Sequence, residues 1–154
     1  MSIPGSEIIA KSISPDRLVS GAIKYKRIIT FFEGAYSIAI DSTGTKLKTA
    51  YHLLEEQDVA HLKEAYFEVA ITDFSATDAT VDIVLYNVTD SVEVVKCSVS
   101  SDTPRVRGTI SIDTIEGLVG KILAVEVRVA TASATSGATA VFKAARLILV
   151  YEIP

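Results

Sequence analysis

Two histidines and the acidic residues between them are the part of this chain whose side chains could do metal or acid–base chemistry. His52 and His61 flank Glu55, Glu56 and Asp58, and the two histidines are nine positions apart. Zinc sites on one helix use histidines four positions apart, and a strand aims two rings at one metal when they are two positions apart. The spacing therefore favours a solvated polar segment. A small metal-dependent hydrolase built on His52 and His61 stays as an alternative.

The rest of the chain offers no recognised catalytic motif. Its serines lack the Gly-x-Ser-x-Gly elbow of hydrolases, and it has no glycine-rich phosphate loop. Cys97 is the single cysteine, so an intrachain disulfide and a cysteine-rich metal site are excluded, and we expect a buried small hydrophobe there. Acidic pairs such as Asp73 with Asp78 occupy turn or outward-facing positions. We expect a protein that is not an enzyme and that uses no cofactor and no metal.

Exposed tyrosines offer a second kind of chemistry, the binding of carbohydrate. The flat face of an aromatic ring packs well against the apolar face of a sugar ring. The chain has no Trp, and the tyrosines that the strand pattern lets point outward are Tyr51, Tyr66 and Tyr86. A carbohydrate-binding jelly-roll module that contacts a surface glycan through these rings is the alternative function. Packing in the core or in an interface is the competing role for each ring.

Composition limits the partners of the chain. The 154 residues fit one domain, and 15 Lys and Arg scattered among 19 Asp and Glu form no basic stripe, so we predict no nucleic-acid partner. Hydrophobic residues make up 49% and mean hydropathy is +0.36. No apolar run is long enough to span a membrane, which predicts no membrane insertion. The apolar excess favours association between copies.

The sequence also carries hints about where the protein is made and where it works. No charged segment followed by an apolar one marks a secretory signal, so we expect synthesis as a cytoplasmic protein. Asn87-Val-Thr89 matches a glycosylation acceptor, which matters only in a secreted chain. One Asn, one Gln, one Met and one Cys in the whole chain predict a thermophile source. A small β domain rich in Val, Ala and Thr is the alternative explanation.

Five aliphatic residues near the start of the chain recur at every fifth position. They are Ile8, Ile13, Leu18, Ile23 and Ile28. A helix repeats its apolar residues every three or four positions and a strand every two, so this period fits neither. It predicts an extended, turning segment whose aliphatic side chains lie along one line and need a covering partner. We predict an N-terminal assembly arm over residues 1–27, with these five residues as the oligomer interface.

Residues 28–154 show the pattern of a β domain. Apolar residues alternate over 66–72, 80–86, 105–112 and 123–129, which predicts strands buried on one face. Residues 36–41 and 46–52 predict a hairpin, and 53–62 one or two helical turns. The apolar strand over 141–153 should be central, because such a strand at an edge would invite aggregation. Without βαβ alternation, we expect an all-β protein, an antiparallel β-sandwich of the jelly-roll type.

Two parts of the sequence resemble known families. The stretch AKSISPDRLVSGAI, residues 10–23, resembles the repeats that precede globular heads in trimeric phage and virus tail fibres, where Ile/Leu-spaced units wind about a threefold axis. Segments 105–110, 117–129 and 144–150 resemble jelly-roll domains of carbohydrate-binding modules and of virion or surface-appendage heads. The resemblance implies a non-enzymatic, self-assembling structural protein whose partner is itself, as a trimer, in a virion, fibre or extracellular appendage. Alternatively, the arm packs on its own subunit or adds a strand to a neighbouring sheet.

Overall fold

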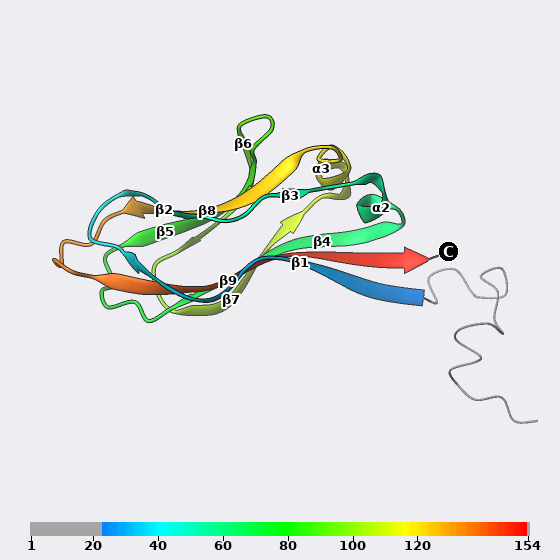
Figure 1. Cartoon of the computed structure of the whole chain (residues 1–154). Coiled ribbons are helices and arrows are strands. Elements are labelled where there is room, and N and C mark those ends of the chain that lie inside the picture. The colour runs from blue at the N-terminus through cyan, green and yellow to red at the C-terminus, as the bar shows by residue number, and fades with distance from the viewer. Residues whose placement is uncertain (1–22, 154) are drawn as a thin grey trace, which may run out of the picture.

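The computed structural model describes residues 23–153, which form two antiparallel sheets packed face to face (Figure 1). Sheet A has the spatial order β1 (Ile23–Ala39), β9 (Thr139–Ile153), β4 (Leu62–Thr72) and β7 (Thr103–Ile110). Sheet B has the order β2 (Gly44–Lys48), β8 (Ile122–Thr131), β5 (Thr80–Asn87) and β6 (Val92–Val99), and the short β3 (His52–Leu53) also pairs with β8. The expected antiparallel β-sandwich is confirmed.

The strand pairing is that of a jelly roll. The pairs are nested along the chain: β1 with β9, β2 and β3 with β8, β4 with β7, and β5 with β6. A long antiparallel hairpin rolled around a barrel produces this nesting. The additional pairs β4 with β9 and β5 with β8 join the nested pairs into the two sheets.

The core forms between the inner faces of the two sheets. The inward side chains of β4 and β5 alternate with outward ones, as the sequence pattern predicted. Phe67 and Ile71 of sheet A and Ile83 and Val127 of sheet B are fully buried. Burial of one face of each strand therefore fixes which side chains remain on the outer faces.

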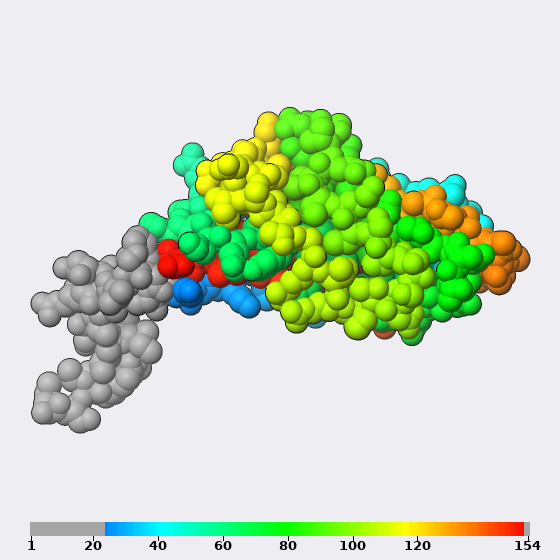
Figure 2. Space-filling view, turned by 180° about the vertical axis from the view of Figure 1, so that it is seen from behind, coloured from blue at the N-terminus to red at the C-terminus, as the bar shows by residue number. Residues whose placement is uncertain are grey.

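The last strand is central, as predicted, because β9 lies between β1 and β4. Two short helices, α2 (Glu56–Val59) and α3 (Ile112–Glu116), lie at the end of the sandwich where β1 starts and β9 ends (Figure 1). The helical turn expected within 53–62 is therefore present. In the space-filling view of the other side, the segment from β6 to β7 covers much of the surface (Figure 2). No helix in the described part of the chain has the length and apolarity needed to cross a membrane.

The predicted hairpin over residues 36–52 is wrong. β1 pairs with β9 in sheet A, whereas β2 pairs with β8 in sheet B, so residues 40–43 cross from one sheet to the other. The main chain of Ile40 is held by the β8–β9 loop, with its N–H 2.9 Å from the Ala138 carbonyl and its carbonyl 2.7 Å from the Ser133 N–H. The turn residues were correctly located, but long-range pairing determines which strands become neighbours.

The predicted boundary between arm and domain falls inside a strand. β1 begins at Ile23 and pairs continuously with β9 from Ile23 to Thr30. Residues 23–27 therefore belong to sheet A, because β9 supplies them with a hydrogen-bonding partner. The remainder of the predicted arm, residues 1–22, lies outside the described residues.

Candidate functional site

The structure describes two residues of the predicted interface line. Ile8, Ile13 and Leu18 lie outside the described residues. Ile23 starts β1, where its main chain pairs with the end of β9. Ile28 follows in the same strand, and its side chain is 53% exposed. Ile28 is thus the residue of the line whose exposed side chain the structure describes.

Ile28 lies in a row of side chains that crosses the outer face of sheet A. Its cross-strand partner is Ile148 of β9, followed by Tyr66 of β4 and Thr109 of β7. Ile148 is only 4% exposed although its neighbours in sequence, Leu147 and Leu149, are the ones that enter the core. The apolar strip of this row consists of Ile148 and the ring of Tyr66, and Ile28 extends it to the edge strand.

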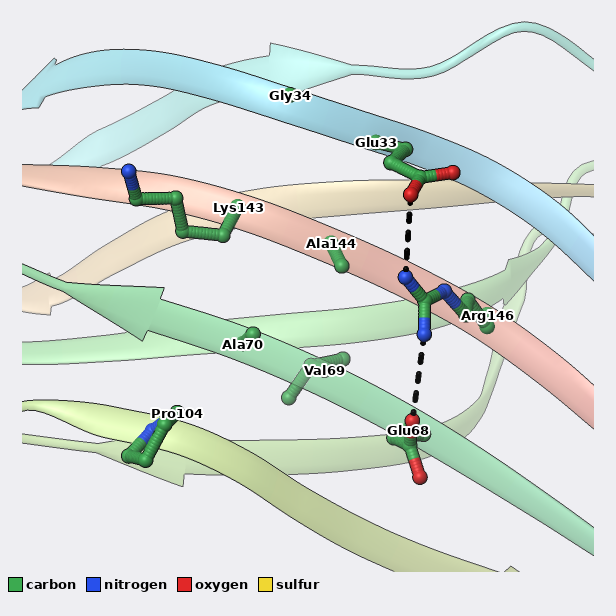
Figure 3. Close-up of a pocket in the computed structure, with 9 residues that line it drawn as sticks. All are labelled: Glu33, Gly34, Glu68, Val69, Ala70, Pro104, Lys143, Ala144 and Arg146. Carbon is green, nitrogen blue, oxygen red and sulfur yellow. Dashed lines mark hydrogen bonds and ion pairs between the residues drawn. The ribbon is translucent and has the colours of Figure 1, made fainter.

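The next row on this face is charged and is centred on Glu68. The Nε of Arg107 lies 2.7 Å from its carboxylate and the Nε of Arg105 3.3 Å from it. Arg146 lies between two carboxylates, 3.4 Å from that of Glu33 and 3.7 Å from that of Glu68 (Figure 3). This row joins β1, β9, β4 and β7 by charge as well as by main-chain hydrogen bonds.

A hollow of about 350 Å³ opens on the outer face of sheet A beside this charged row. Small side chains and charged ones share its lining (Figure 3), among them Glu33, Gly34, Ala70, Lys143, Ala144 and Arg146. Lys143 and Arg146 lie on either side of Ala144 along β9 (Figure 3). The sequence analysis did not single out these residues, which only the register of four strands brings together.

The three candidate sugar-contact tyrosines do not share one surface. Tyr66 lies on the outer face of sheet A, where its hydroxyl donates to Glu64 at 2.6 Å and Arg107 lies over its ring at 5.2 Å. Tyr86 belongs to β5 of sheet B and has Arg128 over its ring at 5.7 Å. Tyr51 precedes β3 and is 68% exposed. Tyr66 and Tyr86 therefore lie on opposite outer faces of the sandwich.

The two histidines have different environments. His52 pairs with Leu123 of β8, and its ring meets that of Phe31 edge-on at 6.3 Å between centroids. His61 adopts a positive φ of 61° between α2 and β4, and its carbonyl accepts the N–H of Glu152 at 3.0 Å. Within residues 23–153, no group of three His, Cys, Asp or Glu side chains is arranged to hold a metal ion.

A buried polar cluster that the sequence analysis missed connects α2 to sheet A. Asp58 is 2% exposed, and the guanidinium of Arg27 contacts its carboxylate. The Tyr151 hydroxyl donates to the Asp58 carbonyl at 2.6 Å, and Tyr25 stacks on Tyr151 with ring centroids 4.7 Å apart. The sequence signal was the three-residue spacing of Glu55 and Asp58, which is typical of a capping box at a helix start.

Two further sequence features are buried. Cys97 is a free thiol in the core, as predicted, and burial raises its pKa. Asn87 of the glycosylation motif is 2% exposed, and its amide donates to the Asp90 carboxylate at 2.9 Å. The Asn87 side chain is therefore occupied within the folded chain, and the motif marks a structural turn.

The stability of the sandwich should fall when His52 gains a proton. Burial chiefly lowers the pKa of His52 from its ordinary 6.5, and the charge of Arg27 adds to this, while Glu55 opposes it. The unfolded chain then binds the proton more readily than the folded chain. The contribution of His52 to stability is therefore fully present above about pH 6.5 and is lost as pH falls through the lowered pKa. Urea unfolding of the wild type and His52→Leu at pH 7.5 and pH 5.5 measures this. The loss on acidification should be smaller in His52→Leu, and an equal loss would show that His52 is not responsible.

Comparisons with known proteins find distant structural matches to two viral structures and to an enzyme, and they assign the chain to no family. No protein-family model and no curated protein matches it. The VP2 subviral particle of infectious bursal disease virus is 13% identical in sequence to this chain. The structural alignment covers 84% of this chain and 33% of the VP2 chain, with a TM-score of 0.47. A structure from the Gx strain of that virus is also 13% identical. Its alignment covers 84% of this chain and 32% of the viral chain, with a TM-score of 0.41. A family two carbohydrate esterase from Cellvibrio japonicus is 9% identical. Its alignment covers 86% of this chain and 36% of the esterase chain, with a TM-score of 0.32.

The chain spans about a third of the length of each of these proteins. Any functional assignment must come from the surfaces of the chain itself.

Proposed function

We propose that this chain is a non-enzymatic structural protein that assembles with copies of itself, as a trimer, in a virion, fibre or surface appendage. The observation that supports this most directly is the exposure of Ile28 at the edge of sheet A. Ile28 is the last of the five aliphatic residues that recur at every fifth position of the N-terminal sequence. An aliphatic side chain that lies half in water, next to an apolar strip, gains free energy when a second copy covers it.

The properties of β1 support contact through side chains rather than through added strands. Within residues 23–153, β1 pairs on one side only, with β9. Exposed Lys24 and Lys26 precede Ile28 in this strand, and lysines at a sheet edge oppose unspecific strand addition. We therefore favour packing of Ile28 and the preceding aliphatic residues around a common axis over insertion of the arm into a neighbouring sheet.

Substitution of the aliphatic line should weaken assembly without unfolding the sandwich. In full-length protein, Ile28→Asp and Leu18→Asp should each weaken association at least about tenfold, because a charge placed in an apolar contact must be dehydrated. Light scattering and sedimentation at micromolar concentration measure the mass. Val92→Asp is the matched control, since Val92 is 51% exposed but belongs to β6 of sheet B.

The results separate assembly from folding. Circular dichroism and thermal unfolding should be nearly unchanged in Ile28→Asp and Val92→Asp, because the substituted side chains are exposed. A wild-type chain that is monomeric at micromolar concentration would contradict the proposal. Equal masses for Ile28→Asp and the wild-type oligomer would remove Ile28 from the interface.

A further inference from the structure

Three exposed apolar side chains lie together on sheet B. Tyr51, Leu53 and Ile122 are exposed to 68%, 49% and 36%. Leu53 of β3 is the cross-strand partner of Ile122 in β8. Tyr51 directly precedes β3, two positions before Leu53, so both side chains lie on the same face of the strand. These three residues form a continuous apolar surface, the β3–β8 patch.

The residues next to the patch show that it faces outward. His52, in the middle of the segment, turns its ring toward sheet A, where it meets Phe31 of β1 edge-on. Leu54 and Leu123, which directly follow the two paired patch residues, are completely buried. Successive side chains of a strand point to opposite faces. The patch residues therefore point away from the core, on the outer face of sheet B.

Charged residues of opposite sign lie at the two ends of the patch. At one end, β2 carries Lys46 and Lys48, and the Lys48 side chain is 67% exposed. At the other end, Glu55 and Glu56 at the start of α2 are exposed. The chain runs along one edge of the sandwich from β2 through β3 to α2 (Figure 1). The patch therefore separates a basic end from an acidic end.

Lys48 and Glu56 have charges that are free to meet a partner. The Lys48 ammonium lies 3.4 Å from Glu126, but Arg128 also contacts that carboxylate, so Glu126 keeps a charge partner without the lysine. Within residues 23–153, Glu56 takes part in no ion pair. Lys48 and Glu56 stand four positions before and four positions after His52. Opposite charges thus lie at similar separations from the centre of the patch.

We propose that the β3–β8 patch forms a two-fold contact with a second copy of this chain. A two-fold rotation reverses the direction of the second copy, so that Lys48 of each copy faces Glu56 of the other. The apolar side chains then cover one another at the centre, and opposite charges meet at both ends. A second copy matches both ends at once, whereas a partner with a single sign of charge matches only one.

This contact goes beyond the proposed assembly through the N-terminal line. It uses neither Ile28 nor residues 1–22, and it lies on sheet B, whereas Ile28 belongs to sheet A. One chain can therefore form both contacts. A two-fold contact added to a three-fold one extends an assembly beyond a closed trimer.

Sedimentation of a full-length variant that lacks the other contact tests the proposal. Protein carrying Leu18→Asp and Ile28→Asp, the parent of this test, should have the mass of a dimer at micromolar concentration. Addition of Leu53→Asp should weaken that dimer about a hundredfold, because the two-fold axis makes each copy lose an apolar contact. Val92→Asp is the matched control, since Val92 is 51% exposed but lies in β6, at the opposite edge of sheet B.

Exchange of the charges tests the two-fold geometry. In the same parent, Lys48→Glu and Glu56→Lys should each weaken the dimer about tenfold, because like charges then face each other at both ends. An equal mixture of the two variants should associate as the parent does, since every end contact again joins Glu and Lys.

The outcomes distinguish this contact from the assembly through the N-terminal line. A monomeric parent would overturn the two-fold contact even if the wild type is a trimer, and a dimeric wild type would leave it standing without the trimer. Unchanged mass of folded Leu53→Asp protein would also overturn it, as would a mixture of the charge variants that associates no better than each alone. Circular dichroism establishes that each variant folds.

Discussion

Replacement of Asp58 by alanine should lower the free energy of unfolding by about 3 kcal/mol. Asp58 is almost completely buried, and its carboxylate contacts the Arg27 guanidinium and accepts the Glu55 N–H at 2.8 Å. Removal of one partner of a buried ion pair costs about 3–5 kcal/mol. We expect the lower end of this range because the Arg27 side chain is 45% exposed and can return to water.

The loss should combine two separable effects. Without the carboxylate, the Glu55 N–H at the start of α2 loses its acceptor, which alone costs about 1 kcal/mol. The remainder comes from the lost contact between α2 and β1. Asp58→Asn keeps an acceptor oxygen and removes the charge, so it should recover the first part and not the second.

Urea unfolding of the full-length protein measures both variants. Asp113→Ala is the matched control, because Asp113 is also an acidic residue in the first turn of a short helix, α3, but is exposed. Its effect should stay within about 0.5 kcal/mol. If Asp58→Ala unfolded at the same urea concentration as Asp113→Ala, the buried cluster would contribute nothing specific to stability.

The features that the sequence predicted correctly are those that a local pattern determines. Alternation in β4 and β5 places Phe67 and Ile83 in the core because a strand repeats every two residues. The central position of β9 followed from the same logic, since a strand that is apolar on both sides needs neighbours on both edges.

The features that were missed depend on partners far away in sequence. The turn at residues 41–44 was located, but β2 pairs with β8, about eighty residues later, so the predicted hairpin is absent. Lys143 becomes a lining residue of the hollow because β9 has one residue more than β4 at that level. Neither strand shows this difference when it is considered alone.

The candidate interface stands between these two cases. The period of five was visible in the sequence, and the exposure of Ile28 agrees with a surface role for that residue. The hydrogen bonding of residues 23–27 with β9 could not be inferred, because the end of the chain supplies the partner strand. Association between copies is likewise a property of more than one chain, so it stays a prediction for solution measurement.

Replacement of Phe142 by alanine should lower the free energy of unfolding by about 3–5 kcal/mol. Phe142 is fully buried in β9, and its ring stacks on that of Phe32 with centroids 4.7 Å apart. The variant loses the apolar surface of the ring and leaves a cavity between the sheets, where close packing limits relaxation. Phe142→Leu refills most of that volume and should cost less than about 1.5 kcal/mol.

The cross-strand partner of Phe142 provides the control for this prediction. Tyr36 of β1 pairs with Phe142 but is 43% exposed, so Tyr36→Ala removes a ring of similar size that is only partly buried. Its cost should be below about 1 kcal/mol, because less of the ring is withdrawn from water. Phe142 also directly precedes the bulged residue Lys143 in β9. Equal costs for Phe142→Ala and Tyr36→Ala would contradict the role of Phe142 in the core.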